Sequence, residues 1–319
     1  MLPIPNFKGF DFFPHGTRID FMRWRDVCFF ASIVMMVASL GLFLVKGLNF
    51  GVDFKGGSLI EVKDTANKPI DIGKLRSQLG ALGLGDVQIQ EFGVPTDALI
   101  RLEQQPGGEA AQQEGLKKVT DSLGSAFEVR RVEVVGPAVS QELRWTGTIA
   151  VIAGILAIIT YVWFRFEWQF ALGTVVALTH DVLLTVGLFS LFDMAFDLSI
   201  VAALLTILGY SVNDTVVVSD RIRENLRKFK RMPLRELLNL SINETLSRTI
   251  LTGATTFAVL IALFIFGGEV IRNFNFAMLF GILVGTYSSI FIAAPVLEYV
   301  GVPRDLDAKA GDKAEAKTA

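Results

Sequence analysis

The sequence predicts a polytopic α-helical membrane protein with six transmembrane helices and one small α/β domain between the first two. Three observations lead to this prediction. Hydrophobic residues make up 51% of the 319 residues and charged residues only 19%, whereas soluble proteins carry about 25% charged residues. The apolar residues gather in six runs near the roughly 20 residues that span a bilayer. The one long polar stretch separates the first two runs.

The six apolar runs are predicted to be helices, because a chain in hydrocarbon must satisfy its backbone hydrogen bonds internally. The first run is longer than the roughly 7–15 apolar residues of a cleaved signal peptide, so we expect it to remain as an anchor. The six helices are expected at residues 27–45, 145–164, 168–192, 198–220, 248–267 and 274–298.

Lys and Arg residues near the ends of the runs predict the orientation of the chain, because basic residues in short segments favour the cytoplasmic side. Segment 1–26 and link 221–247 are rich in both, whereas link 193–197 has neither and link 268–273 has only Arg272. We therefore expect both termini and link 221–247 to be cytoplasmic.

Two further segments are expected on the cytoplasmic side. The apolar spacing of Leu234, Leu237, Leu238 and Ile242 within the basic link predicts an amphipathic helix on the cytoplasmic surface. Packing against the rest of the protein is its default role. The end of the chain, 299–319, is small and charged, and we expect it to be disordered.

The polar stretch at 46–144 is predicted to be a periplasmic domain of order βαββαβ, which is that of a ferredoxin-like fold. Short β-branched runs indicate the strands, and 3.6-residue spacing indicates the helices. This stretch contains neither cysteine nor histidine, and its charges are mixed, so neither a metal site nor a nucleic-acid surface is predicted. Strands are expected at 58–62, 87–92, 98–102 and 127–135, and helices at 72–82 and 109–123.

Asp214 lies inside the fourth predicted helix, where a charge costs at least about 2.5–3.5 kcal/mol. It precedes Asp220 by six residues, which is about 9 Å at 1.5 Å per residue. Arg248 begins the fifth helix from the same side, so antiparallel helices bring the two side chains to a similar depth. Burial favours the protonated acid, whereas a nearby guanidinium favours the carboxylate. Two interpretations stay open: a switchable pair that moves a proton, or a static pair that fixes helix register.

His180 and Asp181 lie deeper, in the third predicted helix. A histidine beside a carboxylate can relay protons near neutral pH, so this pair is a possible proton relay. Adjacent side chains on a helix point about 100° apart, and a plain polar contact to a neighbouring helix is the alternative.

Several other functions are excluded by motifs that the sequence lacks. It has no His-Glu-x-x-His zinc motif, no phosphate-binding Gly-x-x-x-x-Gly-Lys loop and no Gly-x-Ser-x-Gly nucleophile turn. A net charge of −2 is too balanced for a nucleic-acid-binding protein. We therefore predict no enzyme activity, no cofactor, no metal site and no nucleic-acid partner.

Specific motifs resemble those of the SecF family. They include GVDFKGG at 51–57, VGP at 135–137, THD at 179–181, GYSVNDTVVVSDRIREN at 209–225 and LSRT at 246–249. The resemblance covers roughly residues 18–300. The residues that match family motifs include Asp53, Gly56, Gly57, Gly136, Pro137 and Asn213.

The resemblance implies an inner-membrane subunit of the bacterial SecDF complex, of the RND superfamily, that uses the proton motive force in late steps of protein translocation. It implies SecD as partner, the SecYEG channel and possible YajC as neighbours, and exported polypeptides that are held through SecD. Asp214 and Arg248 match the family's proton-pathway positions, while His180-Asp181 matches a motif without an assigned step. A non-conducting assembly subunit and an RND small-molecule exporter half are the alternatives; exporters usually carry two large external domains and twelve helices in one chain.

Overall fold

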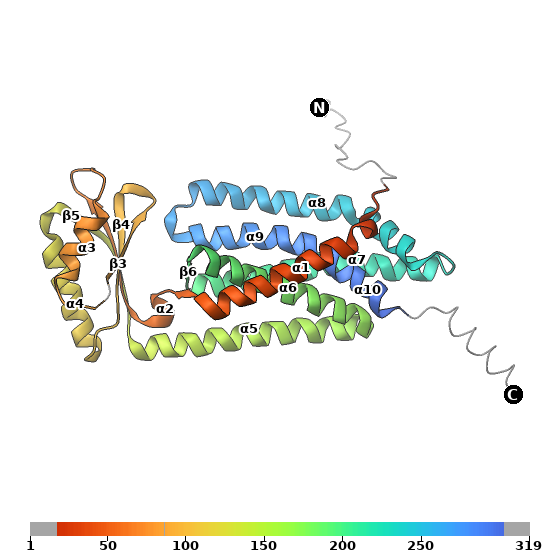
Figure 1. The fold of residues 1–319 in the computed structure, drawn as a ribbon, viewed down its shortest axis with the longest axis horizontal. Helices are drawn as coiled ribbons and strands as arrows, with labels where there is room; N and C mark the ends of the chain where they lie inside the picture. Colours follow the sequence, from red (N-terminus) through yellow and green to blue (C-terminus); the bar gives the residue numbers. More distant parts are fainter. Residues whose placement is uncertain (1–17, 86, 303–319) are drawn as a thin grey trace, which may run out of the picture.

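The computed structural model describes residues 18–85 and 87–302. The expected disordered tail, 299–319, begins two residues too early, because the last helix ends at Val300. Its part from 303 onward and the first part of the N-terminal segment, 1–17, lie outside the described residues. The molecule is elongated: a long helix bundle carries an α/β domain at one of its two ends (Figure 1). We call this end the domain end of the bundle and the opposite one the far end.

Six helices are long and apolar enough to cross a membrane within the described residues, as the sequence predicts. In chain order they are α1 (Arg25–Lys46), α5 (Pro137–Arg165), α6 (Trp168–Phe192), α7 (Leu198–Lys228), α8 (Leu234–Phe266) and the span Glu269–Val300. The last span consists of the short turn η3 (Glu269–Ile271), α9 (Arg272–Ser288), the π-helical segment η4 (Ser289–Ala293) and α10 (Ala294–Val300).

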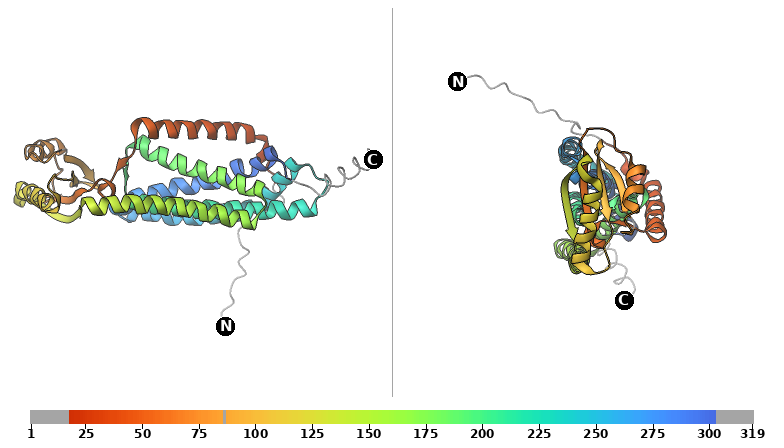
Figure 2. Two further views of the ribbon diagram at one scale, coloured as in Figure 1. Left: turned by 90° about the horizontal axis from the view of Figure 1, so that it is seen from below. Right: turned by 90° about the vertical axis from the view of Figure 1, so that its left-hand side faces the viewer.

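Three spans form the interior of the bundle and three lie outside them. About half or more of the apolar window is buried in α6 (50%), α7 (56%) and the last span (61%), against 11% in each of α1, α5 and α8. Helices α1 and α5 lie on opposite flanks of the bundle (Figure 2). The outer three therefore expose most of their apolar surface, as helices in lipid do.

Three helices extend by eight or more residues beyond the apolar runs that predicted them. Helix α5 begins at Pro137 instead of 145, α7 continues to Lys228 instead of 220, and α8 begins at Leu234 instead of 248. Hydropathy measures preference for lipid, whereas a helix continues until its backbone hydrogen bonds end. Polar residues at a helix end therefore do not mark its last turn.

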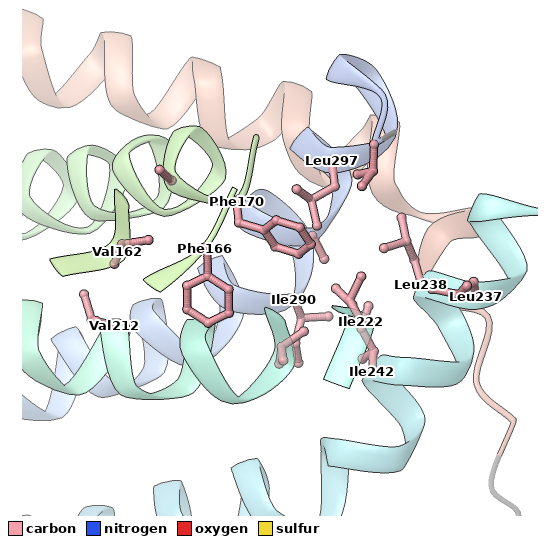
Figure 3. Close-up of a cluster of buried hydrophobic side chains, with 14 of the residues drawn as sticks. Val162, Phe166, Phe170, Val212, Ile222, Leu237, Leu238, Ile242, Ile290 and Leu297 are labelled. Atoms are coloured by element: carbon pink, nitrogen blue, oxygen red, sulfur yellow. The ribbon is translucent and has the colours of Figure 1, made fainter. Parts of the chain in front are cut away.

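The expected amphipathic surface helix is the first part of α8. Its apolar side chains Leu237, Leu238 and Ile242 are fully or almost fully buried, in one cluster with Ile222 of α7. Figure 3 shows this cluster at the far end of the bundle, together with Phe170 of α6 and side chains of the other helices. This segment thus packs against the other helices through its apolar side, which is the role expected for it by default.

The α/β domain has the predicted βαββαβ order. Its antiparallel sheet has the strand order β3-β4-β2-β5, and both helices pack against one core that includes Ile60, Leu79 and Ile100, each 0% exposed. Strands β2 and β4 are longer than predicted. The elements are β2 (Gly57–Asp64), α3 (Ile72–Gly80), β3 (Val87–Phe92), β4 (Val94–Leu102), α4 (Gly108–Leu123), η2 (Gly124–Ala126) and β5 (Phe127–Val135).

The domain is tied to the bundle by elements that the sequence did not predict. A two-residue strand β1 (Asn49–Phe50) pairs in parallel with β6 (Ala195–Phe196), which lies in the link between α6 and α7. The short helix α2 (Val52–Lys55) follows β1 and leads into the sheet. At the other end of the bundle, η1 (Phe21–Arg23) packs against the first turns of α8, where Met22 N–H donates to Asn239 Oδ1 at 3.0 Å.

Candidate functional site in the helix bundle

Asp214 lies on α7 inside the bundle and is 2% exposed. Within the described part of the chain, its Oδ2 atom has no hydrogen-bond partner. Two threonine hydroxyls, of Thr215 beside it and of Thr249 on α8, are likewise buried without a partner among these residues. A buried polar atom without a partner costs about 1–3 kcal/mol. Helices α7 and α8 therefore carry buried polar atoms whose hydrogen bonds are not made within the described residues.

Arg248 lies on α8, immediately before Thr249, and its side chain is exposed at the surface of the bundle. Its charge acts on Asp214 electrostatically. Among the described residues, the two groups form no salt bridge in this structure. The helices α7 and α8 thus bring the acid and the cation into electrostatic range while leaving them unpaired.

His180 and Asp181 form the most buried ionisable pair of the bundle's interior, and both are 0% exposed. Nδ1 of His180 lies 2.9 Å from Oδ1 of Asp181. Oδ2 of Asp181 accepts hydrogen bonds from Ser211 Oγ of α7 at 2.5 Å and from Ser288 Oγ of α9 at 2.9 Å. The pair thus makes both contacts considered from the sequence: the two side chains meet each other, and Asp181 also bonds two neighbouring helices.

This network continues to α1 through Tyr287. The Tyr287 ring stacks on that of His180, with centroids 5.9 Å apart and planes at 29°. Its hydroxyl donates to Cys28 O at 2.9 Å and lies 3.0 Å from Ser32 Oγ. The hydroxyl partners Ser211, Ser288 and Tyr287 were not identified from the sequence. Of these three, only Ser211 could have been recognised from the sequence, because it precedes Asp214 by about one helical turn.

The residues of the first family motif lie at the junction of domain and bundle. Oδ2 of Asp53 accepts a hydrogen bond from the backbone N–H of Leu198, the first residue of α7, at 2.9 Å. Gly56 and Gly57 have φ of +77° and +117°. A Cβ on Gly57 would lie 2.3 Å from Leu102 O, so only glycine fits there. These residues position α7 and the sheet, and they lie away from Asp214.

The other motif residues lie at two further places, the start of α5 and the exposed side of α7. Gly136 is the residue before α5, and Pro137 is its first residue, where the missing N–H of proline costs nothing. Asn213 is exposed on the outer side of α7, next in sequence to the buried Asp214. The structure therefore joins His180 and Asp181 by a direct contact. It shows no direct contact between Asp214 and Arg248 among the described residues, and the remaining motif residues are dispersed.

Comparisons with known proteins identify relatives over most of the chain. Residues 115–302 match the family of the protein export membrane protein SecD/SecF, C-terminal, and residues 41–63 match the SecD/SecF GG motif. The chain is 50% identical over 311 residues to the protein translocase subunit SecF of Rhodobacter capsulatus, with 93% of each chain covered. It is 42% identical to SecF of Escherichia coli O157:H7, with 91% of each covered.

Solved structures of SecDF share the fold. A crystal structure of SecDF from Thermus, a translocon-associated membrane protein, has a TM-score of 0.80 at 36% identity, covering 89% of this chain and 39% of that one. SecDF in a super-membrane-facing form has a TM-score of 0.66 at 35% identity, covering 95% of this chain and 40% of that one. The chain thus spans about two fifths of each SecDF chain.

Proposed function

This chain belongs to the SecF family of protein-translocase subunits, and from that premise we propose that it joins SecD and couples proton movement at Asp214 to protein export. The observation that carries the proposal is the unpartnered, buried carboxylate of Asp214, with Arg248 in electrostatic range but not bonded to it. Such a carboxylate inside a membrane span is expensive and is usually functional.

The proposed cycle alternates between two arrangements of α7 and α8. When Arg248 approaches Asp214, the guanidinium favours the carboxylate and the acid releases its proton. When Arg248 withdraws, burial favours the neutral acid, which takes up a proton. If the two states open to opposite sides of the membrane, each cycle moves one proton. One charge that crosses 100 mV supplies about 2.3 kcal/mol, which is then available to assist translocation.

The exposed surface of α7 favours contact with the helices of a partner protein in the membrane. Its exposed side carries small or polar residues, Thr206, Gly209 and Asn213, at spacings of three and four residues. Polar side chains are costly against lipid, whereas small and polar residues favour close contact between helices. A second set of helices, which SecD supplies in this proposal, would cover this stripe.

The proposal places the protein in the bacterial inner membrane, with both termini in the cytoplasm and the α/β domain in the periplasm. It works beside the SecYEG channel, with YajC as a further possible neighbour, and meets exported polypeptides through SecD. The density of Lys and Arg around the far end of the bundle supports this orientation.

The test is co-reconstitution with SecD in vesicles, where export and ion flux are measured under a pH gradient or a Na⁺ gradient. Asp214→Asn should abolish proton-driven export while the complex still assembles. Asp220→Asn is the matched control, because this acid lies on the same helix but is exposed and paired with Arg165. Undiminished export in Asp214→Asn would overturn the proposal in favour of an assembly role, and flux that follows Na⁺ alone would overturn the choice of ion.

A further inference from the structure

We propose that Asp181 is a positioning residue for Asp214: its carboxylate fixes α7 between α6 and α9, one helical turn from the acid. This inference rests on the proposed function of Asp214 and adds a residue that acts on it through Ser211. It assigns no proton transfer to Asp181 itself.

Three helices converge on the Asp181 carboxylate. Ser211 of α7 and Ser288 of α9 both donate to Oδ2, at 2.5 and 2.9 Å, and His180 of α6 faces Oδ1 at 2.9 Å. A hydrogen bond is electrostatically stronger in the low-dielectric interior of a protein than in water. Because Asp181, Ser211 and Ser288 are each 0% exposed, this carboxyl group sets the relative positions of α6, α7 and α9.

Ser211 transmits that position to Asp214. It precedes Asp214 by three residues, so the two side chains are neighbours on one face of α7. The backbones of α7 and α9 also approach closely here: a Cβ on Gly285 would lie 3.1 Å from Ser211 Cβ, and one on Gly281 would lie 2.4 Å from Ile207. The position of Ser211 is therefore set both by this close contact with α9 and by its hydrogen bond to Asp181. Loss of that hydrogen bond changes the position of the turn of α7 that carries Asp214.

The α9 side of the contact adjoins an irregular helix. Ser288 is the last residue of α9, and the π-helical segment η4 begins at the next residue. Single π-turns inside α-helices are frequent at functional sites. The hydrogen bond from Ser288 to Asp181 therefore fixes the last regular turn of α9. The π-helical segment η4 follows directly, and there the helix can change its hydrogen-bonding pattern.

His180 completes the setting of the carboxylate. Its Nδ1 satisfies Oδ1, its ring stacks on Tyr287, and its Nε2 is buried without a partner among the described residues. The titratable groups on the surrounding helices include Asp214 and Tyr210 on α7, Tyr287 on α9, Cys28 on α1 and Arg248 on α8. Removing a serine hydroxyl changes none of these charges, so its effect on Asp214 reports position.

The experiment uses the complex with SecD in vesicles and compares Ser211→Ala, Ser288→Ala and Asp181→Asn. Ser190→Ala is the matched control, because Ser190 is a buried serine of α6 that donates to Gly47 O at the domain end. Two properties are measured besides recovery of the complex: proton flux, and the pH midpoint of the infrared carboxyl band that disappears in Asp214→Asn. A structural loss alone lowers recovery but does not move the midpoint.

Ser211→Ala is expected to lower proton flux about tenfold, as for the loss of one buried hydrogen bond, and to shift the midpoint of the band. Ser288→Ala should act in the same direction, and Ser211→Ala combined with Asp181→Asn should cost no more than Asp181→Asn alone. If Asp181→Asn does not assemble, the two single-hydroxyl variants decide.

Flux and midpoint in Ser211→Ala and Ser288→Ala that equal those in Ser190→Ala would overturn the positioning role. A wild-type complex whose flux does not respond to Asp214→Asn would instead overturn the proposed function. The two failures are therefore distinguishable.

Discussion

The carboxylate of Asp53 accepts a hydrogen bond from the backbone N–H of Leu198 at 2.9 Å, so an acid that follows the first span caps the helix that carries Asp214. The first N–H groups of a helix have no partner within it, and an acid there also interacts favourably with the helix dipole. Asp197 caps the same end through Ile200 N–H at 3.2 Å. The start of α7 is thus held both by the link before it and by the junction with the α/β domain.

Replacing Asp53 should separate these two contributions. Asp53→Ala removes the acceptor and should lower the free energy of unfolding by about 0.5–2 kcal/mol. Asp53→Asn keeps an acceptor oxygen and should cost less. Thermal unfolding of the purified chain measures both variants, and equal stability of Asp53→Ala and wild type would show that Asp197 alone caps α7.

Gly57→Ala should be strongly destabilising. The backbone has φ of +117° and an added Cβ would meet Leu102 O at 2.3 Å, so the cost should exceed about 1 kcal/mol. Gly80→Ala, at the end of α3 where the Cβ would meet nothing within 4 Å, is the control in the same domain. Limited proteolysis and thermal unfolding compare them; a Gly57→Ala protein as stable as Gly80→Ala would contradict the strain.

Arg248→Gln should reduce proton-driven export nearly as much as Asp214→Asn, because Asp214 then lacks the charge that favours its carboxylate. Arg248→Lys keeps a positive charge and should retain part of the activity. The control is Arg227→Gln, an exposed arginine near the end of α7. Export by vesicles under a pH gradient is the measurement, and full activity of Arg248→Gln would exclude a switchable pair.

Gly209→Leu should weaken binding of SecD. Gly209 is exposed on α7 and a Cβ there would meet nothing within 4 Å, so the bulky side chain should disturb a partner helix without disturbing this chain. Ala153→Leu, on the exposed side of α5, is the control. Recovery of SecD with the tagged chain should fall about tenfold, the effect of ~1.4 kcal/mol. Equal recovery for both variants would place the partner elsewhere.

Much of the architecture could be predicted because its signals are local. Runs of apolar residues mark the membrane spans, and alternation with turn residues gives β3 and β5 their observed bounds. Helix ends were less predictable: α5 and α8 begin well before their apolar runs, since a helix does not end where it leaves lipid. The parallel pairing of β1 with β6 joins distant segments, and two residues carry too little pattern to predict it.

The candidate site was predictable only in part, for a similar reason. A carboxylate such as Asp214 within an apolar run is costly wherever the helix packs, so it can be recognised from the sequence. Ser211 and Ser288 are common residues in membrane helices and become significant only through their contact with Asp181. Their contribution depends on which helix faces are turned toward each other.

The sequence by itself determined that this protein crosses the membrane with six helices, carries a βαββαβ domain and buries an acid in its fourth span, because hydropathy and period act along the chain. Only the tertiary structure decided that Asp181 joins α6, α7 and α9, that Asp53 caps α7, and that Asp214 Oδ2 is buried without a partner among the described residues. These contacts depend on how each helix is rotated and how closely it packs against its neighbours. Both the rotation and the spacing are determined by side chains that lie far apart in the sequence.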